Sequence, residues 1–391
     1  MGHDAPRVLF VLNHAGAGGT ERYVESLMGG LVPQGMSAML AYHEEGPLVA
    51  RLADMGIPCV RVRMRSRFDL RAARGLARIA REFDADVVHA MFLREHYLLW
   101  LARLFGLRAR RMATVHLMLE QVARPPLGWV DRAVYRGMAA IVTVCELLAT
   151  QMRAAYGLGA SQVIAIPNGI AVAEAPEGQW AAERTKTRVT LEIPDNAVVF
   201  LTAGRFSEEK GYFFLLDAIR DWRDKAASEM AGPAPVRFVL AGDGPLLHPF
   251  RERLAQEGLT GLVTCVGYRR DLPALMRAAD VYVSPSRTEA MSLSILEAMG
   301  AGLPVVATAV GGTPELIRPQ WDNGLLVPCG DVAALADALR QMAGDEALRL
   351  RLGAQGAVVT REHFSESGTH RRTLAVYERL AGCMVASGRI K

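Results

Sequence analysis

Short apolar runs alternate with amphipathic stretches along the whole chain, a pattern typical of α/β proteins. The strands predicted in the first half are residues 7–12, 37–41, 59–63, 86–90, 111–115, 141–144 and 163–166. Helical patterns lie between them at residues 21–31, 70–83 and 96–105. The second half repeats the scheme, with strands predicted at residues 198–203, 237–241, 262–266, 281–283, 305–307 and 324–327. We therefore expect two doubly wound domains, each a parallel sheet with helices on both faces.

The length of 391 residues suits two domains. Residues 171–194, rich in Ala, Glu and Pro, predict a linker between them. We expect the first domain to cover residues 1–175 and the second residues 190–365, followed by a last helix near residues 364–380. In such a pair a ligand is expected between the domains, at the carboxyl ends of the strands.

Composition narrows the class of protein. The apolar fraction of 51% is ordinary for a globular protein with full cores. The five cysteines lie in no metal-ligand or C-x-x-C spacing, so we expect reduced, mostly buried thiols at Cys59, Cys145, Cys265, Cys329 and Cys383. The start of the chain lacks a basic leader region, and no run of 18 uncharged apolar residues occurs. These features predict a cytoplasmic protein.

Charge is distributed unevenly along the chain. Residues 1–175 contain 20 Arg, no Lys and 15 acidic residues, and the remainder has 25 basic and 26 acidic residues. Four arginines follow helical spacing opposite a set of small or apolar residues, Leu70, Ala73, Ala77 and Ala80. The arginine stripe consists of Arg71, Arg74, Arg78 and Arg81. Two interpretations are open: a solvated helix face, or peripheral contact with an anionic membrane or lipid-diphosphate acceptor at the inner face of the membrane. No interleaved aromatics or known modules suggest nucleic acid binding.

The run Glu289-Ala-Met-Ser-Leu-Ser-Ile-Leu-Glu297 carries the strongest chemical signal. Its apolar spacing predicts a helix that begins near Ser292 or Ser294 and ends near Gly300. Eight residues of helix rise about 12 Å, so the two carboxylates cannot grip one atom. They can hold two ends of one elongated ligand, with an anion at the helix N-terminus between them. Hydroxyl groups at each end and an anion in the middle describe a nucleotide sugar.

Two further segments fit a diphosphate. Arg205 and Lys210 follow a predicted strand in Gly204-Arg-Phe-Ser-Glu-Glu-Lys-Gly211, and together they can neutralise a diphosphate leaving group without a metal ion. Taken alone, this is also the pattern of a solvated basic loop. In the first half, Gly18 and Gly19 follow the first strand in a loop that can approach phosphate, although its spacing is not that of a nicotinamide site.

These segments together resemble the retaining glycosyltransferases of family 4, the group 1 or glycogen-synthase-like enzymes with the GT-B fold. The resemblance spans nearly the whole chain. Its other motifs are Gly18-Gly-Thr-Glu21, Thr114-Val-His116, Ile166-Pro-Asn-Gly169, Ala241-Gly-Asp-Gly-Pro245, Gly311-Gly-Thr-Pro-Glu315 and Asn323-Gly-Leu-Leu-Val327. It implies two Rossmann-like domains facing a central cleft, the first for the acceptor and the second for the nucleotide-sugar donor. The final helix, residues 366–391, would return to the first domain.

The resemblance also implies roles for single residues. Glu297 would accept hydrogen bonds from both ribose hydroxyls, and Glu289 would face the donor sugar. The backbone at Met291, Ser292 and Leu293 would meet the sugar or phosphate. Gly267, Tyr268 and Arg269 would meet the nucleobase. The catalytic set would be Glu289, His116, Arg205 and Lys210, with Glu21, Asn168 and Glu315 as acceptor or accessory residues. Ala290 replaces a glycine that is common in the family, which leaves the identity of the sugar open.

The reaction implied is hexose transfer from a UDP- or GDP-sugar to an acceptor hydroxyl, with retention and without metal or cofactor. The acceptor would be a saccharide or lipid-linked intermediate of polysaccharide or lipopolysaccharide synthesis, or else a soluble small molecule. A nucleotide-sugar epimerase and a non-catalytic sugar-nucleotide sensor are the alternatives from other classes. Acceptor-dependent turnover separates the three.

Overall fold

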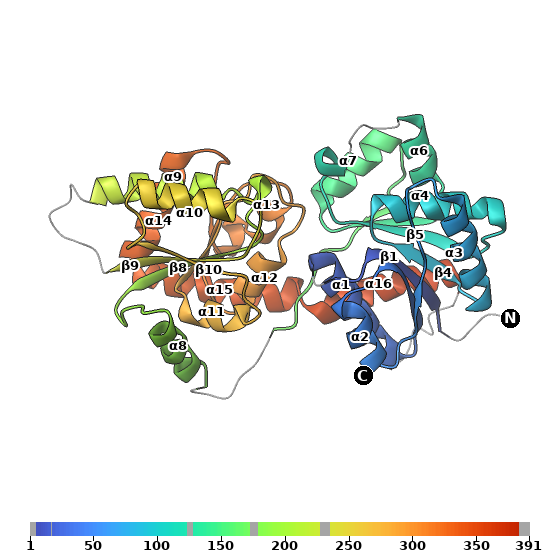
Figure 1. The fold of residues 1–391 in the computed structure, drawn as a ribbon, viewed down its shortest axis with the longest axis horizontal. Coiled ribbons are helices and arrows are strands. Elements are labelled where there is room, and N and C mark those ends of the chain that lie inside the picture. Colours follow the sequence, from blue (N-terminus) through green and yellow to red (C-terminus); the bar gives the residue numbers. More distant parts are fainter. Residues whose placement is uncertain (1–4, 17, 123–127, 173–178, 227–234, 383–391) are drawn as a thin grey trace. The chain divides into compact units, whose positions relative to one another are not determined.

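A computed structural model describes residues 5–16, 18–122, 128–172, 179–226 and 235–382. The chain divides into two units (Figure 1). Unit 1 comprises Met1–Asn168 with Glu366–Lys391, and unit 2 comprises Gly169–Ser365. No helix among the described residues is both long enough and apolar enough to cross a bilayer.

Unit 1 is built on a parallel sheet with the strand order β3-β2-β1-β4-β5-β6-β7. The strands are β1 Arg7–His14, β2 Ser37–Glu44, β3 Cys59–Arg61, β4 Val87–Ala90, β5 Arg110–Val115, β6 Ala140–Thr143 and β7 Val163–Ala165. The helices are α1 Gly19–Leu31, α2 Pro47–Asp54, α3 Leu70–Glu82, α4 Leu93–Ala102, α5 Leu119–Val122, α6 Trp129–Arg136, α7 Glu146–Tyr156 and α16 Glu366–Ala381. Short 3-10 helices follow α1 at Val32–Gln34 and α4 at Arg103–Phe105.

Unit 2 repeats the plan with the strand order β10-β9-β8-β11-β12-β13. Its strands are β8 Val198–Ala203, β9 Val236–Ala241, β10 Val263–Gly267, β11 Val281–Ser284, β12 Val305–Thr308 and β13 Leu325–Val327. Its helices are α8 Gln179–Thr190, α9 Tyr212–Ala226, α10 Leu247–Gln256, α11 Leu272–Ala278, α12 Leu293–Gly300, α13 Thr313–Leu316, α14 Val332–Gly344 and α15 Glu346–His363. The predicted fold class, two Rossmann-like parallel-sheet domains, is confirmed.

The order of the strands determines where each unit can bind a ligand. Each chain segment winds outward from its first strand, β1 or β8, and then crosses to the other side at β4 or β11. The central strands are almost wholly buried, as their continuous apolar runs require, whereas the edge strands β3 and β10 are mostly half-buried. A crevice therefore opens beyond the carboxyl ends of β1 and β4 in unit 1, and of β8 and β11 in unit 2.

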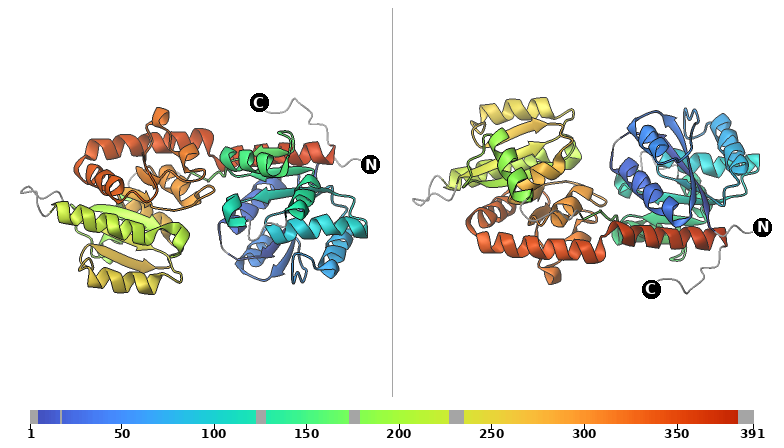
Figure 2. Two further views of the ribbon diagram at one scale, coloured as in Figure 1. Left: turned by 90° about the horizontal axis from the view of Figure 1, so that it is seen from above. Right: turned by 90° about the horizontal axis from the view of Figure 1, so that it is seen from below.

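The final helix α16 packs on α1 in unit 1, and Figure 2 shows the two side by side. The Ser26 hydroxyl donates to a Glu366 carboxylate oxygen at 2.5 Å and lies 2.8 Å from His370 Nε2. Deeper in the unit, the Tyr377 hydroxyl lies 2.7 Å from Nδ1 of the fully buried His89. These side-chain bonds hold the last described helix against elements from the start of the chain.

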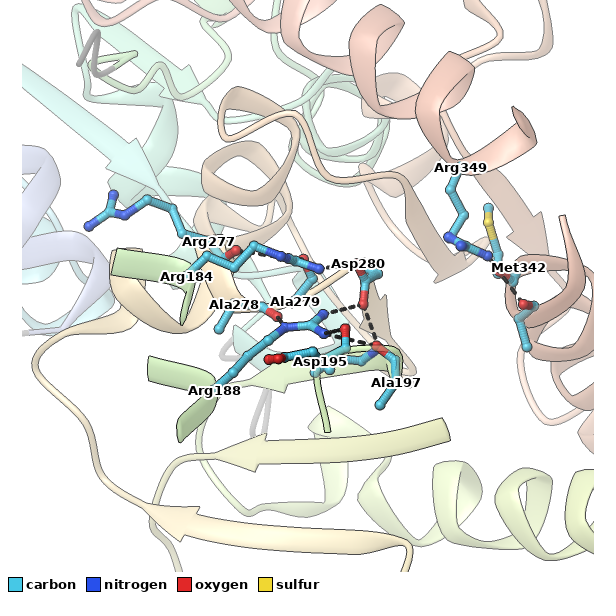
Figure 3. Close-up of polar contacts among 12 residues, drawn as sticks. Arg184, Arg188, Asp195, Ala197, Arg277, Ala278, Ala279, Asp280, Met342 and Arg349 are labelled. Carbon is cyan, nitrogen blue, oxygen red and sulfur yellow. Dashed lines mark hydrogen bonds and ion pairs between the residues drawn. The ribbon is translucent and has the colours of Figure 1, made fainter. Parts of the chain in front are cut away.

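The segment predicted as a linker contains an ordered helix, so that prediction was wrong for residues 179–190. Helix α8 is held to the end of α11 by guanidinium groups (Figure 3). Arg188 donates to the Ala278 carbonyl at 3.0 Å, and Arg184 donates to the Ala279 carbonyl at 2.8 Å. Both arginines also pair with Asp280, at 2.7 and 2.6 Å. The last carbonyls of a helix lack intrahelical partners, and here α8 supplies them.

The cysteines differ from the prediction in their burial. Among the described cysteines none is disulfide-bonded. Cys145 alone of this set is buried, Cys59 and Cys265 are half-buried, and Cys329 is exposed. Cys383 lies outside the described residues. The expectation of mostly buried thiols was therefore wrong.

Candidate active site

In unit 2 the crevice beyond β8 and β11 contains Lys210 and Glu289. Lys210 ends the 3-10 helix Glu208–Lys210, and its Nζ donates to Glu289 Oε2 at 2.5 Å. Gly211 has φ +67° and lies so close to the Pro285 carbonyl that a Cβ would be 2.0 Å from its oxygen. Only glycine fits this position, and the contact keeps the lysine loop against the end of β11.

The predicted helix between the two glutamates exists as α12, Leu293–Gly300. Ser292 is its N-cap and accepts a hydrogen bond from the Ile295 N–H at 3.3 Å, which confirms one of the two predicted starts. Ser294 lies 3.1 Å from Ser292 through the hydroxyl oxygens. Met291 is buried just before the cap, and Leu293 is half-buried at the first helical position. The first N–H groups of such a helix form an anion site.

Tyr282 of β11 lies near both Glu289 and Glu297. Its hydroxyl donates to the Ala203 carbonyl at 3.1 Å. Burial raises the pKa of the Tyr282 phenol, and the nearby Glu297 and Glu289 carboxylates raise it further. Both glutamates therefore lie within electrostatic range of one phenol. Lys210, Tyr282, Ser284, Ser286, Ser292 and Ser294 line a cavity of about 10 Å³, close to the space that one water occupies.

The other donor residues predicted in unit 2 follow the strands β8 and β10. Arg205 follows β8 and is exposed. Gly267 has φ +72° at a bulge that ends β10, and Tyr268 beside it is 65% exposed. Arg269 makes a two-pronged ion pair with Asp271, at 2.7 and 2.6 Å. The edge of its guanidinium is therefore engaged by a carboxylate.

The loop before α13 packs on the Glu289 loop. The Gly312 N–H donates to the carbonyls of Glu289 and Ala290 at 3.2 and 3.1 Å. This contact ties α13, which carries the half-buried Glu315, to the lysine–glutamate centre. Asn168, by contrast, is buried at the last position of the first stretch of unit 1.

In unit 1 the loop after β1 leads into α1. Gly18 is the N-cap of α1 in an extended conformation, and Gly19 is the first helical residue. Glu21 is buried, and its carboxylate folds back over Gly18, where a Cβ would lie 2.6 Å from Oε2. Ala17, which precedes these glycines, lies outside the described residues.

His116 follows β5 and packs edge-on against Tyr23, with ring centroids 4.9 Å apart. Its Nε2 is buried and makes no hydrogen bond within the described residues. Burial, and next the neighbouring His96, lower the pKa of His116 to about 3. The ring is therefore neutral at physiological pH.

A cavity of about 460 Å³ in unit 1 brings His116 and Glu21 together. It is lined by residues from the ends of β1, β4 and β5 and from the first turns of α1 and α4. Two of its residues were not predicted: Glu95 and His96, in the first turn and a half of α4. Burial raises the pKa of Glu95 to about 8 and lowers that of His96 to about 4. Their place just after β4 was the signal that could have found them, because carboxyl ends of adjoining strands meet at one edge.

The arginine stripe lies on α3 as predicted, and Arg71, Arg74, Arg78 and Arg81 are exposed. Arg78 lies 3.9 Å from Glu82 in an exposed pair. The buried side carries Ala73, Ala77 and Ala80, but Leu70 is 52% exposed, so its assignment to that side was wrong. Leu70 is the first residue of the helix, where the chain has just left the Asp69 cap. Among the described residues no three His, Cys, Asp or Glu side chains gather as metal ligands would.

Two family models match the chain, one in each half. Glycosyltransferase Family 4 matches residues 17–174, and Glycosyl transferases group 1 matches residues 197–345. The chain belongs to the group 1, family 4 glycosyltransferases. The resemblance found in the sequence is thereby confirmed, and the protein is a transferase enzyme.

Relatives of this glycosyltransferase differ in what they glycosylate. It is 27% identical over 265 residues to the alpha-D-kanosaminyltransferase of Streptomyces kanamyceticus, an alignment that covers 67% of this chain and 66% of the relative. It is 26% identical over 302 residues to the lipopolysaccharide core biosynthesis glycosyltransferase LpsD of Rhizobium meliloti (strain 1021), covering 77% and 78%. Anabaena Alr3699/HepE, solved with UDP, has 20% identity and a TM-score of 0.80, covering 95% of this chain and 100% of that one. This last similarity supports the GT-B fold.

Proposed function

We propose that this glycosyltransferase moves a hexose from a nucleoside diphosphate sugar to an acceptor hydroxyl, with retention of configuration and without a metal ion. The observation that carries the proposal is the Lys210–Glu289 pair at the N-terminus of α12, with Glu297 on the same helix. A cation, a helix N-terminus and two carboxylates offer partners for diphosphate, sugar and ribose in one crevice.

In the proposed reaction the acceptor oxygen attacks the anomeric carbon as the bond to the diphosphate breaks. The leaving phosphate takes the acceptor proton, so no other base is required. Lys210 and Arg205 neutralise the charge that develops on the diphosphate. Glu289 positions sugar hydroxyls and stabilises positive charge near the anomeric carbon, and Glu297 accepts hydrogen bonds from the ribose diol.

UDP is the proposed nucleotide. HepE has been solved with UDP and with UDP-glucose, and an Escherichia coli relative is named for transfer from UDP-Gal to a lipid diphosphate. GDP stays as the alternative donor base. Glycoconjugate synthesis is the proposed setting, because LpsD is named for lipopolysaccharide core biosynthesis. A soluble acceptor is the alternative, because another relative is named a 2-deoxystreptamine glucosyltransferase.

Calorimetry tests the donor site directly. UDP, GDP and ADP are titrated into the wild-type protein in EDTA, and the sugar nucleotides of the binding base are then tried with and without acceptors. Binding of one diphosphate and acceptor-dependent release of it support the proposal. Conversion of the sugar without acceptor indicates an epimerase, and binding without any turnover indicates a sensor. If none of the three diphosphates binds, the proposal is wrong.

A further inference from the structure

The 460 Å³ cavity of unit 1 contains buried polar groups that no protein atom satisfies. Glu95 is 0% exposed and His96 is 1% exposed. Within the described residues, neither carboxyl oxygen of Glu95 and neither ring nitrogen of His96 makes a hydrogen bond of normal geometry. Backbone N–H groups lie near the Glu95 carboxyl, and the Ala90 and Thr114 backbone lies near the His96 ring. The Tyr135 hydroxyl and His116 Nε2 line the same cavity and are unsatisfied as well. Buried polar groups are normally hydrogen-bonded, so such a concentration calls for a partner.

The position of these groups is that of a ligand site. Glu95 and His96 begin α4 directly after β4, and His116 follows the adjacent strand β5. Their side chains reach the cavity at the carboxyl edge of the sheet, where open α/β sheets bind ligands. The rest of the wall is largely apolar, with Met91, Phe92, Leu93 and Val115. An apolar wall with a few convergent polar groups suits a small ring whose edges carry hydroxyls.

Charge decides between uncharged and charged rings. Arg94 faces the cavity but is already engaged, because it donates to Asn13 Oδ1 and to the Met64 carbonyl. His96 and His116 are neutral. The cavity is also lined by His14, which ends β1, and by Glu21, in the first turn of α1. Burial raises the pKa of the Glu95 carboxyl to about 8 and so keeps it protonated near neutral pH, although its own backbone N–H, then Arg94 and the backbone N–H groups of Phe92 and Asn13, lower the pKa. A protonated carboxyl and neutral imidazoles each both donate and accept hydrogen bonds, as hydroxyl groups require.

We propose that this cavity binds the acceptor as an uncharged saccharide or cyclitol ring, and that Glu95 and His96 recognise its hydroxyl groups. This proposal rests on the proposed function in one respect: the ring is the acceptor only if the protein transfers a sugar to it. Binding of the ring itself does not require transfer. Glu95 is the main specificity residue because both its oxygens are buried and unsatisfied.

A structural role is the competing explanation for Glu95. It is the third residue of α4, where a glutamate can reach back to the N-cap N–H, here that of Phe92. The two roles predict opposite effects on stability. If Glu95 caps the helix, Glu95→Leu lowers the melting temperature. If Glu95 binds a ligand instead, the same substitution leaves the melting temperature unchanged or raises it, because an unsatisfied buried carboxyl has been removed.

Ring binding is measured by saturation-transfer NMR and titration with methyl α-glucoside, methyl α-galactoside, methyl α-mannoside and myo-inositol. Glucosamine and glucose 6-phosphate serve as the cationic and anionic counterparts. We expect at least one uncharged ring to bind wild type, and Glu95→Leu to weaken it at least tenfold. Glu95→Gln should stay within about threefold at pH 7, because the amide also donates and accepts. Glu45→Gln, at an exposed glutamate, is the control.

A pH series gives a readout that a structural role would not move. Raising the pH through 8 should weaken ring binding to wild type and leave Glu95→Gln unchanged. Binding of no uncharged ring, equal binding to Glu95→Leu, or tenfold tighter binding of either charged ring overturns the proposal. The failures are separable: ring binding without UDP binding contradicts the proposed function alone, and UDP binding without ring binding contradicts this inference alone.

Discussion

The crevices of the two units differ in whether their polar side chains have hydrogen-bond partners within the protein. In unit 2 the half-buried Lys210 and Glu289 are joined at 2.5 Å, and Ser292 caps the helix beside them. In unit 1 Glu95, His96 and His116 are brought into one cavity, and among the described atoms the Glu95 carboxyl oxygens, the His96 ring nitrogens and His116 Nε2 make no hydrogen bond of normal geometry. One crevice holds a charged pair, and the other holds neutral buried groups without hydrogen bonds of normal geometry.

The difference indicates how each crevice would meet its ligand. A paired lysine and glutamate keep their geometry before a ligand arrives, and the lysine has two further N–H donors for an anion. An unsatisfied buried polar group costs about 1–3 kcal/mol, so the unit 1 cavity lowers stability until hydroxyl groups fill it. Preorganised charge suits a diphosphate, and unsatisfied neutral groups suit a polyol.

The largest effect is expected from removal of the carboxylate in the charged crevice. Glu289→Ala should lower turnover about 100- to 1000-fold, because charge stabilisation near the anomeric carbon is lost. UDP should bind equally or more tightly, since the Lys210 ammonium is released from its partner. Steady-state kinetics and calorimetry measure the two effects, with the exposed Glu208→Ala in the lysine loop as control. Wild-type turnover in Glu289→Ala would show that its assigned role is wrong.

Lys210→Ala should weaken UDP binding about 100-fold, because a charge-assisted contact to the diphosphate is lost and Glu289 is left without its partner. Calorimetry in EDTA measures the loss. Lys225→Ala, at an exposed lysine that pairs with Asp221, is the matched control. Ring binding in the unit 1 cavity should be unchanged. A UDP affinity that Lys210→Ala does not alter would remove the lysine from the donor site.

The pH dependence of stability tests the protonation of Glu95 in the unit 1 cavity. The pKa of Glu95 is raised to about 8 in the folded protein, so between its unfolded value and pH 8 the folded state holds a proton that the unfolded state has lost. The contribution of Glu95 to stability therefore falls as the pH rises through this window. We therefore compare the free energies of unfolding of Glu95→Gln and wild type at two pH values. The value for Glu95→Gln minus that for wild type should be about 2–3 kcal/mol larger at pH 7 than at pH 5.

His96 and His116 change stability in the other direction. Their pKa values are lowered to about 4 and about 3, so folding releases protons and stability rises with pH up to the unfolded value of histidine. Because both rings are present in wild type and in Glu95→Gln, their contributions cancel in the difference between the two urea-unfolding series. A difference that does not vary with pH would mean that Glu95 is ionised in the folded protein.

Glu297→Gln should weaken UDP binding about tenfold through the ribose, because a carboxylate offers acceptors alone whereas an amide turns one partner into a donor. 2′-Deoxy-UDP sharpens the test. Wild type should bind it less tightly than UDP, and Glu297→Gln should narrow that preference. An unchanged preference between the two nucleotides would place the ribose elsewhere.

The arginine stripe should have the smallest effect. If it contacts a membrane, Arg71→Gln, Arg74→Gln and Arg78→Gln together should reduce co-sedimentation with vesicles of phosphatidylglycerol and phosphatidylcholine several-fold. Three exposed arginines of unit 2, Arg270, Arg351 and Arg361, are changed to Gln as control. Vesicles of phosphatidylcholine alone should bind neither protein. Unchanged sedimentation of the stripe variant would identify α3 as a solvated face.

Local pattern explains why most elements could be predicted and why some could not. The strand runs are apolar on both faces, so every predicted strand has a counterpart in one of the two sheets. Helix α8 was not predicted, because its residues are largely polar. Its attachment depends on hydrogen bonds from Arg184 and Arg188 to Asp280, about ninety positions away. The exposure of Leu70 was not predicted, because helical spacing does not show whether the first turn of a helix packs on the core.

The sequence by itself determined the class of protein: two parallel-sheet units, a group 1 glycosyltransferase, and the motif with Glu289 and Glu297. The two units follow from periodicity, and the family follows from motifs that resemble it, each made of residues close together in the chain. Only the tertiary structure decided that Lys210 pairs with Glu289, 79 positions away, and that Glu95, His96 and His116 share one unsatisfied cavity. Burial and pairing depend on which strand ends become neighbours in a sheet, and chain-local pattern does not show which polar groups are left there without partners.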